Sequence, residues 1–225
     1  MPAAWTTEES ALVHGVVAGL VLDEDSGQVL VGIRDVQQNR RHPGVVSVPT
    51  IRVPLGLAKE LCAGRVPSPT CRSLELSGPW RQVGGRGGTR TLEGLVFETI
   101  LAKKLVHGDS LESGTVRGRC AAQLAMLDEV DDPTGRDGSN ELTLMVTLVA
   151  YLRDARAYVR SRTASYASLE WLPPAEVIEA WRQRDAQRLF PRANPFEICI
   201  RGLCMRSAVY LLESAAAAEY ESAGR

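Results

Sequence analysis

The sequence predicts a single α/β domain, with a mixed sheet and helices packed on its faces. Three observations support this prediction: a strand–turn–strand unit near the N-terminus, an apolar helix in the middle of the chain, and a later strand that is apolar on both faces. Alternation of strands and helices along a chain is typical of layered α/β folds. A chain of 225 residues is long enough to bury the core of such a domain.

The strand–turn–strand unit is a predicted β-hairpin. Its strands, residues 13–22 and 28–34, are rich in Val, Leu and Gly, and the acidic turn between them ends in Gly27. Glycine adopts the positive φ that tight turns often need. A third strand is predicted for residues 45–53, after a polar and basic segment.

Residues 54–91 are expected to form an insertion or a long loop. They hold four prolines and a glycine-rich run at 84–88, and no hydrophobic period persists in them. Only residues 55–62 have the composition of a short helix. The glycine-rich run either binds a phosphate with its backbone N–H groups or serves as a flexible connection.

Residues 92–106 carry the clearest helical pattern in the first half of the chain. Leu92, Val96 and Ile100 form one apolar stripe, and Leu101 and Leu105 continue it. A glycine at 108 is placed to end the helix. The pattern therefore predicts a helix that packs on a sheet.

The second half of the chain supplies further strands and two helices. Residues 116–127 fit a strand or a helix equally well, whereas residues 142–152 are apolar throughout and predict a central strand. A short final strand is expected at 168–171, and a helix that opens at Pro173-Pro174 is expected to continue to residue 188.

A last helix is predicted for residues 195–217. Asn194 is the expected N-cap, Pro195 occupies the first helical position, and Glu197 completes a capping box. We therefore expect one domain over residues 12–217, with tails at 1–11 and 218–225.

Composition excludes several classes of protein. The formal net charge of −1 gives no general attraction to nucleic acid or to an anionic membrane. The longest apolar runs are shorter than the roughly 20 residues of a membrane-spanning helix, and the N-terminus lacks a secretory signal pattern. The odd number of cysteines, without a C-x-x-C pair, indicates free thiols and a cytoplasmic protein. The cysteines are Cys62, Cys71, Cys120, Cys199 and Cys204.

The segment 87–109, GGTRTLEGLVFETILAKKLVHGD, resembles the Nudix box, G-x5-E-x7-R-E-U-x-E-E-x-G-U with U an apolar residue. Gly87, Glu93 and Gly108 occupy the positions of the first glycine, the first glutamate and the last glycine. The hairpin with the following residues 42–53, and the closing residues 169–174, are also similar to parts of Nudix proteins. The resemblance implies an α/β/α sandwich, here with a long Gly/Pro-rich insertion and an extra C-terminal helix.

The box lacks the residues that carry its chemistry. In the Nudix superfamily, glutamates of the box helix bind Mg²⁺ ions that bridge a diphosphate. Here Leu101 and Ala102 replace the Arg-Glu pair, and Leu105 and Val106 replace the Glu-Glu pair. Hard divalent cations need oxygen ligands, which these side chains do not have. The family's metal ligands therefore do not carry over to this chain.

Two groups of polar residues remain as site candidates. Glu93, Glu98 and Glu141 are the candidate catalytic carboxylates, and the alternative is that they are solvated surface charges. A basic group is the candidate phosphate grip, since arginine forks suit phosphate oxygens; the alternative is a basic surface loop. The basic candidates are Arg34, Arg40, Arg41, His42 and Arg52.

Three functions stay open at this point. The favoured one is binding of a nucleotide or another phosphorylated small molecule, with weak or no hydrolysis and no metal site assigned. The second is an atypical Nudix hydrolase with a relocated Mg²⁺ or Mn²⁺ site. The third is a protein–protein interaction module, for example a homodimer that uses the C-terminal helix. Nucleic-acid and membrane partners are not expected.

Overall fold

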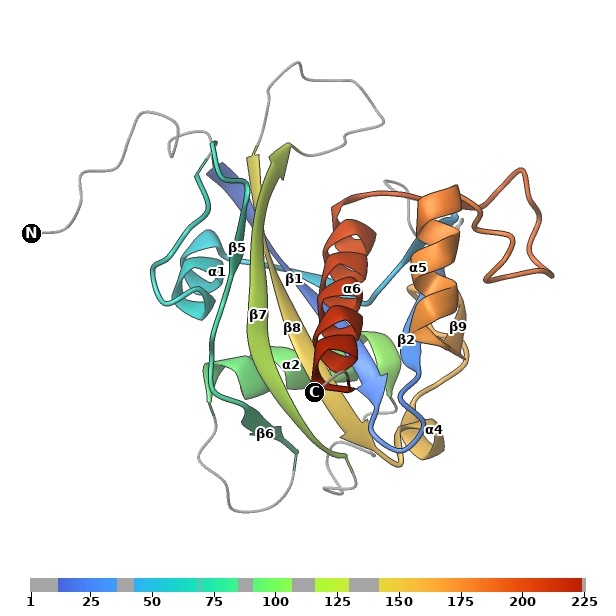
Figure 1. The fold of residues 1–225 in the computed structure, drawn as a ribbon, viewed down its shortest axis with the longest axis horizontal. Helices are drawn as coiled ribbons and strands as arrows, with labels where there is room; N and C mark the ends of the chain where they lie inside the picture. Colours follow the sequence, from blue (N-terminus) through green and yellow to red (C-terminus); the bar gives the residue numbers. More distant parts are fainter. Residues whose placement is uncertain are drawn as a thin grey trace, which may run out of the picture.

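The computed structural model describes residues 12–35, 43–68, 70–84, 91–106, 116–129 and 142–223. A twisted mixed sheet runs through the domain, and helices pack against it (Figure 1). The strands are β1 (Leu12–Asp23), β2 (Val29–Arg34), β3 (Val45–Ser47), β4 (Thr50–Val53), β5 (Ser73–Glu75), β6 (Arg81–Val83), β7 (Arg117–Glu129), β8 (Leu142–Arg153), β9 (Tyr166–Leu172) and β10 (Cys199–Ile200). The helices are α1 (Leu55–Leu61), α2 (Leu92–Ile100), the π-helix η2 (Leu101–Leu105), α4 (Ala155–Tyr158), α5 (Pro174–Gln183) and α6 (Leu203–Ala223).

The order of strands places β8 in the middle of the sheet. The main path is β10-β3-β2-β1-β8-β7-β5, while β4 also pairs with β1, β6 with β7, and β9 with β2. β8 is parallel to β1 and antiparallel to β7. Its residues from Thr143 to Ala150 are all buried, because layers of helices cover both faces there. The prediction of a central strand is confirmed, and residues 117–129 are a strand.

The predicted N-terminal hairpin is confirmed, but the third predicted strand is divided in two. β1 and β2 pair next to their turn, at Leu22 and Val29. Farther from the turn, β2 pairs with β3 and β1 pairs with β4. The chain crosses from one to the other at Pro49, whose carbonyl accepts a hydrogen bond from the N–H of Gly19 at 2.8 Å. We call this opening between β1 and β2, filled by residues 47–50, the fork.

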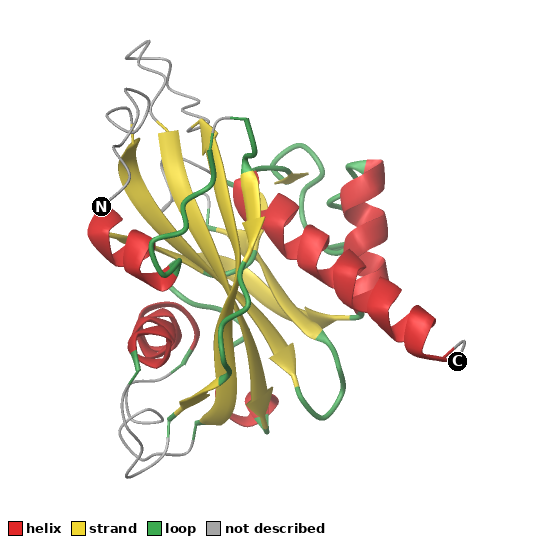
Figure 2. Cartoon of the chain, turned by 60° about the vertical axis from the view of Figure 1, so that its left-hand side comes forward, coloured by secondary structure: helices red, strands yellow, loops and turns green. Residues whose placement is uncertain are grey.

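Two apolar cores confirm the α/β/α sandwich. Side chains alternate along β1, so that Val17 and Val21 join the core beneath α1 and α2, whereas Ala18 and Leu20 join the core beneath α5 and α6. Figure 2 shows helices on both sides of the sheet. Each helix layer therefore buries one face of the same strands.

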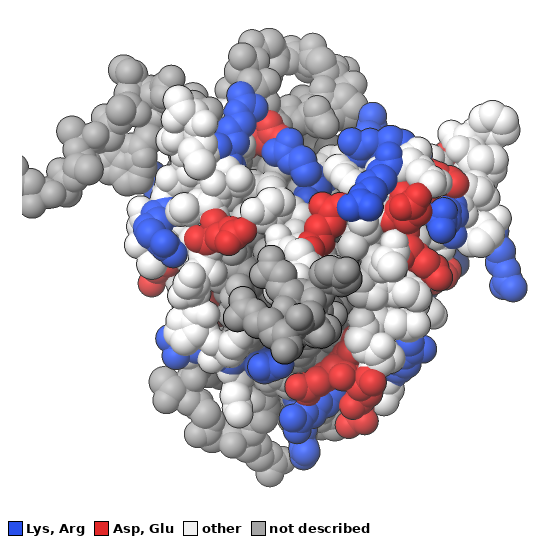
Figure 3. Space-filling view, viewed as in Figure 1, with Lys and Arg blue, Asp and Glu red and all other residues white. Residues whose placement is uncertain are grey.

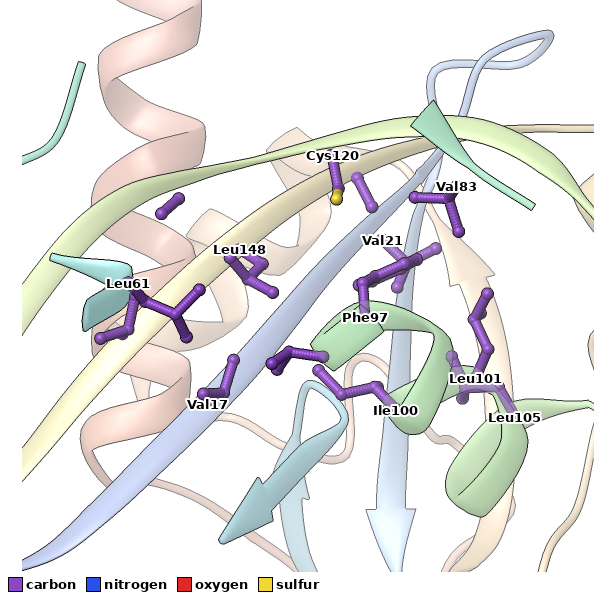
Figure 4. Close-up of a cluster of buried hydrophobic side chains, with 14 of the residues drawn as sticks. Val17, Val21, Leu61, Val83, Phe97, Ile100, Leu101, Leu105, Cys120 and Leu148 are labelled. Atoms are coloured by element: carbon purple, nitrogen blue, oxygen red, sulfur yellow. The ribbon is translucent and has the colours of Figure 1, made fainter. Parts of the chain in front are cut away.

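The box helix belongs to the first core. Figure 4 shows Phe97, Ile100, Leu101 and Leu105 directed toward the sheet. Leu101 is 0% exposed and Leu105 is 1% exposed, which confirms the predicted stripe. The helix ends in a π turn, in which the N–H of Val106 donates to the carbonyl of Leu101 at 3.0 Å.

The long loop expected at residues 54–91 is interrupted by two short strands that the sequence did not predict. The short helix expected at 55–62 is present as α1, and residues 73–75 and 81–83 form strands that pair with β7. Short edge strands of three residues carry too weak a pattern to be recognised between prolines. Whether this region is an insertion relative to the Nudix superfamily stays a prediction.

The predicted start of the last helix is also wrong. Asn194 does not cap a helix; its Oδ1 accepts the N–H of Phe196 at 3.1 Å within a turn, and Phe196 is 96% exposed. The next residues pair with β3 as strand β10, so that Cys199 lies on a strand, and α6 begins only at Leu203. The capping signal involves only neighbouring residues, whereas pairing with the edge strand β3 determines the conformation of residues 199–200. The preceding helix, expected to reach 188, ends at Gln183.

No described helix is long and apolar enough to cross a membrane. On the face seen in Figure 3, Lys and Arg side chains are interspersed with Asp and Glu. This pattern agrees with the small net charge of the chain.

We predict that Leu105→Ala lowers the free energy of unfolding by about 2–5 kcal/mol, because it leaves a cavity in the core. Leu95→Ala on the same helix is the matched control, since Leu95 is 40% exposed; its loss should stay within roughly 0.5 kcal/mol. Urea denaturation followed by circular dichroism measures both. Equal losses would show that the box helix is not held by this apolar face.

Candidate functional site

The positions of the Nudix box that hold metal cannot do so here. Leu101, Leu105 and Val106 are buried in the core and only Ala102 is exposed. None of the four has an oxygen ligand in its side chain. In the described ranges, no group of three or more His, Cys, Asp or Glu side chains is arranged to hold a metal ion. The residues at these four positions therefore do not fit a metal.

The two candidate carboxylates of the box helix lie on α2, and both are half-buried. Both act on the thiol of Cys120 in β7: burial raises its pKa to about 12, and the negative charges of Glu93 and Glu98 add to this. Neither carboxylate forms an ion pair with a residue that the structure describes. Glu141, the third candidate, lies outside the described residues.

Arg34, by contrast, is held firmly at the fork. It is the last residue of β2 and is half-buried. Its Nε donates to Ser47 Oγ at 3.0 Å, and its Nη2 donates to Thr50 Oγ1 at 2.8 Å. Because Ser47 ends β3 and Thr50 begins β4, the guanidinium bridges the two strands that meet at the fork.

A buried tyrosine completes this network. Tyr166 begins β9, is 2% exposed, and donates from its hydroxyl to the carbonyl of Val48 at 3.2 Å. Burial raises the pKa of Tyr166, whereas the charge of Arg34 and the nearby polar groups of Ser47 and Thr50 oppose the rise. The phenol therefore anchors the crossing whose two hydroxyls hold the guanidinium.

A second cation lies close to this network. Lys104, in the π turn, donates from Nζ to Ser165 Oγ at 2.7 Å and is half-buried. Burial lowers the pKa of Lys104, and the positive charges of Arg34 and Lys103 lower it further. Neither Arg34 nor Lys104 forms an ion pair with an Asp or Glu of the described ranges. We call Arg34 and Lys104 the fork cations.

Of the other basic candidates, only Arg52 can be placed. It is exposed on β4 opposite Val16, and it shares a face of that strand with Thr50, two residues away. Arg52 therefore lies along the same strand edge that Arg34 reaches. The predicted residues Arg40, Arg41 and His42 lie outside the described residues.

The sequence did not indicate several members of this site: Ser47, Thr50, Lys104, Ser165 and Tyr166. Lys104 lies in a helix whose clearest sequence pattern is an apolar face. That pattern gives no indication of a role for the lysine. The hydroxyl residues belong to separate strands, and nothing in their local sequence shows that the fork brings them together. The assembled group offers two cations and several hydroxyls, which suit an oxyanion with many acceptor oxygens.

Comparison with known proteins adds a structural likeness. No protein family and no curated protein matches the sequence. Among solved structures, a NUDIX domain of Shewanella oneidensis NrtR, cocrystallised with ADP ribose, is 14% identical with a TM-score of 0.39, over 79% of this chain and 83% of that chain. A NUDIX hydrolase from Alicyclobacillus acidocaldarius is 14% identical with a TM-score of 0.34, over 76% and 83%. At this level of similarity, the ligand and the activity are properties of those two proteins.

The lowered pKa of Lys104 predicts a pH dependence of stability. The unfolded chain keeps this proton up to the ordinary lysine pKa of about 10.5, whereas the folded protein releases it at lower pH. Between the two pKa values the unfolded state binds more protons, so the stability of the folded protein rises with pH. The wild type should therefore gain stability relative to Lys104→Met as the pH approaches 10.5 from below.

Urea denaturation at several pH values from 7 to 10 measures this difference. Lys103→Met removes an exposed charge that contributes to the shift, so its pH dependence should lie between those of the wild type and Lys104→Met. If the stability of the wild type and that of Lys104→Met changed with pH to the same extent, the predicted electrostatic repulsion at the fork would be contradicted.

Proposed function

We propose that this protein binds a nucleotide or another phosphorylated small molecule at the fork, with little or no metal-dependent hydrolysis. The observation that supports this most strongly is the pair of fork cations. Arg34 and Lys104 are half-buried and near enough for the charge of Arg34 to lower the pKa of Lys104. No described carboxylate pairs with either of them.

Such an arrangement costs stability in the absence of an anion. Two like charges repel, and partial burial removes part of the water that would screen them. A bound anion would offset both costs. Residues whose charges are perturbed in this way are candidates for functional sites.

Phosphate fits this site better than a single carboxylate does. It carries more charge and more acceptor oxygens, so that a guanidinium and an ammonium can bind it at the same time. The hydrogen bonds from Arg34 to Ser47 and Thr50 fix the guanidinium before a ligand arrives. Arg52 on the neighbouring strand, with Arg40, Arg41 and His42 as predicted, extends the basic group toward a second phosphate.

Two other functions have some support. Glu93 and Glu98 both remain on α2, and a hydrolase with Mg²⁺ or Mn²⁺ bound by these residues and Glu141 is the first alternative. The second is an interaction module or homodimer, since residues 214–218 of α6 are exposed. We favour the binding function, because residues 101, 102, 105 and 106 carry no oxygen ligand in their side chains whereas the fork cations are in place.

Isothermal titration with pyrophosphate, ADP and a nucleoside diphosphate sugar tests the proposal. We expect binding by the wild type, and a loss of affinity of roughly 10- to 100-fold in Arg34→Met and in Lys104→Met, since a hydrogen bond to a charged group contributes about 1.5–3 kcal/mol. Arg65→Met is the matched control: Arg65 is exposed and follows α1, on the other side of the molecule from β2 (Figure 1). Unchanged affinity in both fork variants would overturn the proposed site.

The same ligands with Mg²⁺ or Mn²⁺, assayed for phosphate release, separate binder from hydrolase. We expect release to stay at background, with no change in Glu93→Gln, Glu98→Gln or Glu141→Gln. Release that Glu141→Gln abolishes would establish the hydrolase instead. If no ligand binds and light scattering detects a dimer, the interaction module is the better description.

A further inference from the structure

We infer that Tyr166 is a positioning residue that fixes Arg34 for an oxyanion. This inference rests on the proposed function, because it assigns a role within the same site. Tyr166 itself is not expected to touch the ligand, since it is 2% exposed.

The ring of Tyr166 is tightly packed against β2. Tyr166 lies over Gly32 of β2, where an added Cβ would stand 2.6 Å from Tyr166 Cδ1 and 2.6 Å from Leu169 Cδ2. Real Cβ atoms do not approach other atoms that closely, so only glycine at position 32 leaves room for the ring. Glycine at position 32 therefore allows the ring of Tyr166 to pack directly against the backbone of β2.

The hydroxyl of Tyr166 points into the crossing between β3 and β4. Its Oη donates to the carbonyl of Val48 at 3.2 Å. Val48 lies between Ser47 and Thr50 in the chain, so the phenol holds the segment that carries both acceptors of Arg34.

Tyr166 lies opposite Arg34 in the pairing of β9 with β2. Ser47 Oγ and Thr50 Oγ1 are the two acceptors that hold the guanidinium, at 3.0 and 2.8 Å. The hydrogen bond from the phenol to the carbonyl of Val48 fixes the backbone between these two acceptors. Without the phenol, the crossing loses this bond, and the two hydroxyls no longer hold Arg34 in one direction. Ordering of Arg34 would then have to accompany binding of the ligand.

Tyr166→Phe tests this inference, because it removes one oxygen and keeps the ring over Gly32. With pyrophosphate as the probe, we expect roughly a 3- to 10-fold weaker affinity, the range of one net hydrogen bond. Tyr158→Phe is the matched control, since Tyr158 is also buried and its hydroxyl donates to a backbone carbonyl, that of Arg153 at 3.0 Å. It should lower the melting temperature to a similar extent and leave the affinity unchanged.

A double-mutant cycle with Arg34→Lys separates positioning from general loosening of the fold. If Tyr166 acts through Arg34, the two substitutions together should weaken binding by less than the product of their separate effects. Ser47→Ala, which removes one of the two acceptors that orient Arg34, should weaken binding as Tyr166→Phe does, and it replaces that variant if Tyr166→Phe does not fold.

The outcomes are distinct. Wild-type affinity in Tyr166→Phe, or effects that multiply fully with those of Arg34→Lys, would overturn the positioning role while the fork remains a binding site. No binding of pyrophosphate by the wild type would overturn the proposed function, and the positioning role with it.

Discussion

The crossing of the chain from β3 to β4 is the constraint on which the rest of the site depends. At Pro49 the backbone leaves the edge of β2 and reaches the edge of β1, so that the sheet opens between two strands that begin as a hairpin. A proline at the crossing has no N–H that a ladder would have to satisfy. The opening leaves room for the charged side chain of Arg34 between the strands. In a continuous sheet, hydrogen-bonded backbone would occupy this place.

The two faces of the helix at residues 92–105 have different roles. Leu101 and Leu105 fill the core that the sheet needs, while Lys104 of the same π turn reaches Ser165 at the start of β9. A helix that binds a metal ion exposes carboxylates, whereas this helix presents a lysine at its C-terminal end. Under the proposed function, an anionic ligand contacts that lysine directly, without an intervening metal.

Elements with a hydrophobic pattern over many consecutive residues could be predicted from the sequence. Contacts between segments that are distant in the sequence could not. The central strand β8 and the stripe ending in Leu105 followed from hydrophobic periods over many residues. Asn194 gave a strong local signal for a helix start, yet the edge of β3 drew the next residues into β10. Arg34 was recognisable as one member of the basic group predicted to bind phosphate. Its partners Ser47, Thr50 and Tyr166 were not, because each belongs to a different strand and only the crossing at Pro49 brings them together.

The burial of Leu101 and Leu105 also limits which substitutions this helix accepts. A glutamate at either position would place a charge in a core without a partner, at a cost that one domain of marginal stability does not tolerate. Of the four positions 101, 102, 105 and 106, only Ala102 is exposed and accepts a carboxylate freely, and a single carboxylate there makes a poor cation site. A metal site at these positions would require several simultaneous substitutions together with a rebuilt core. Packing of this face therefore closes the one-step routes by which the helix could acquire metal ligands.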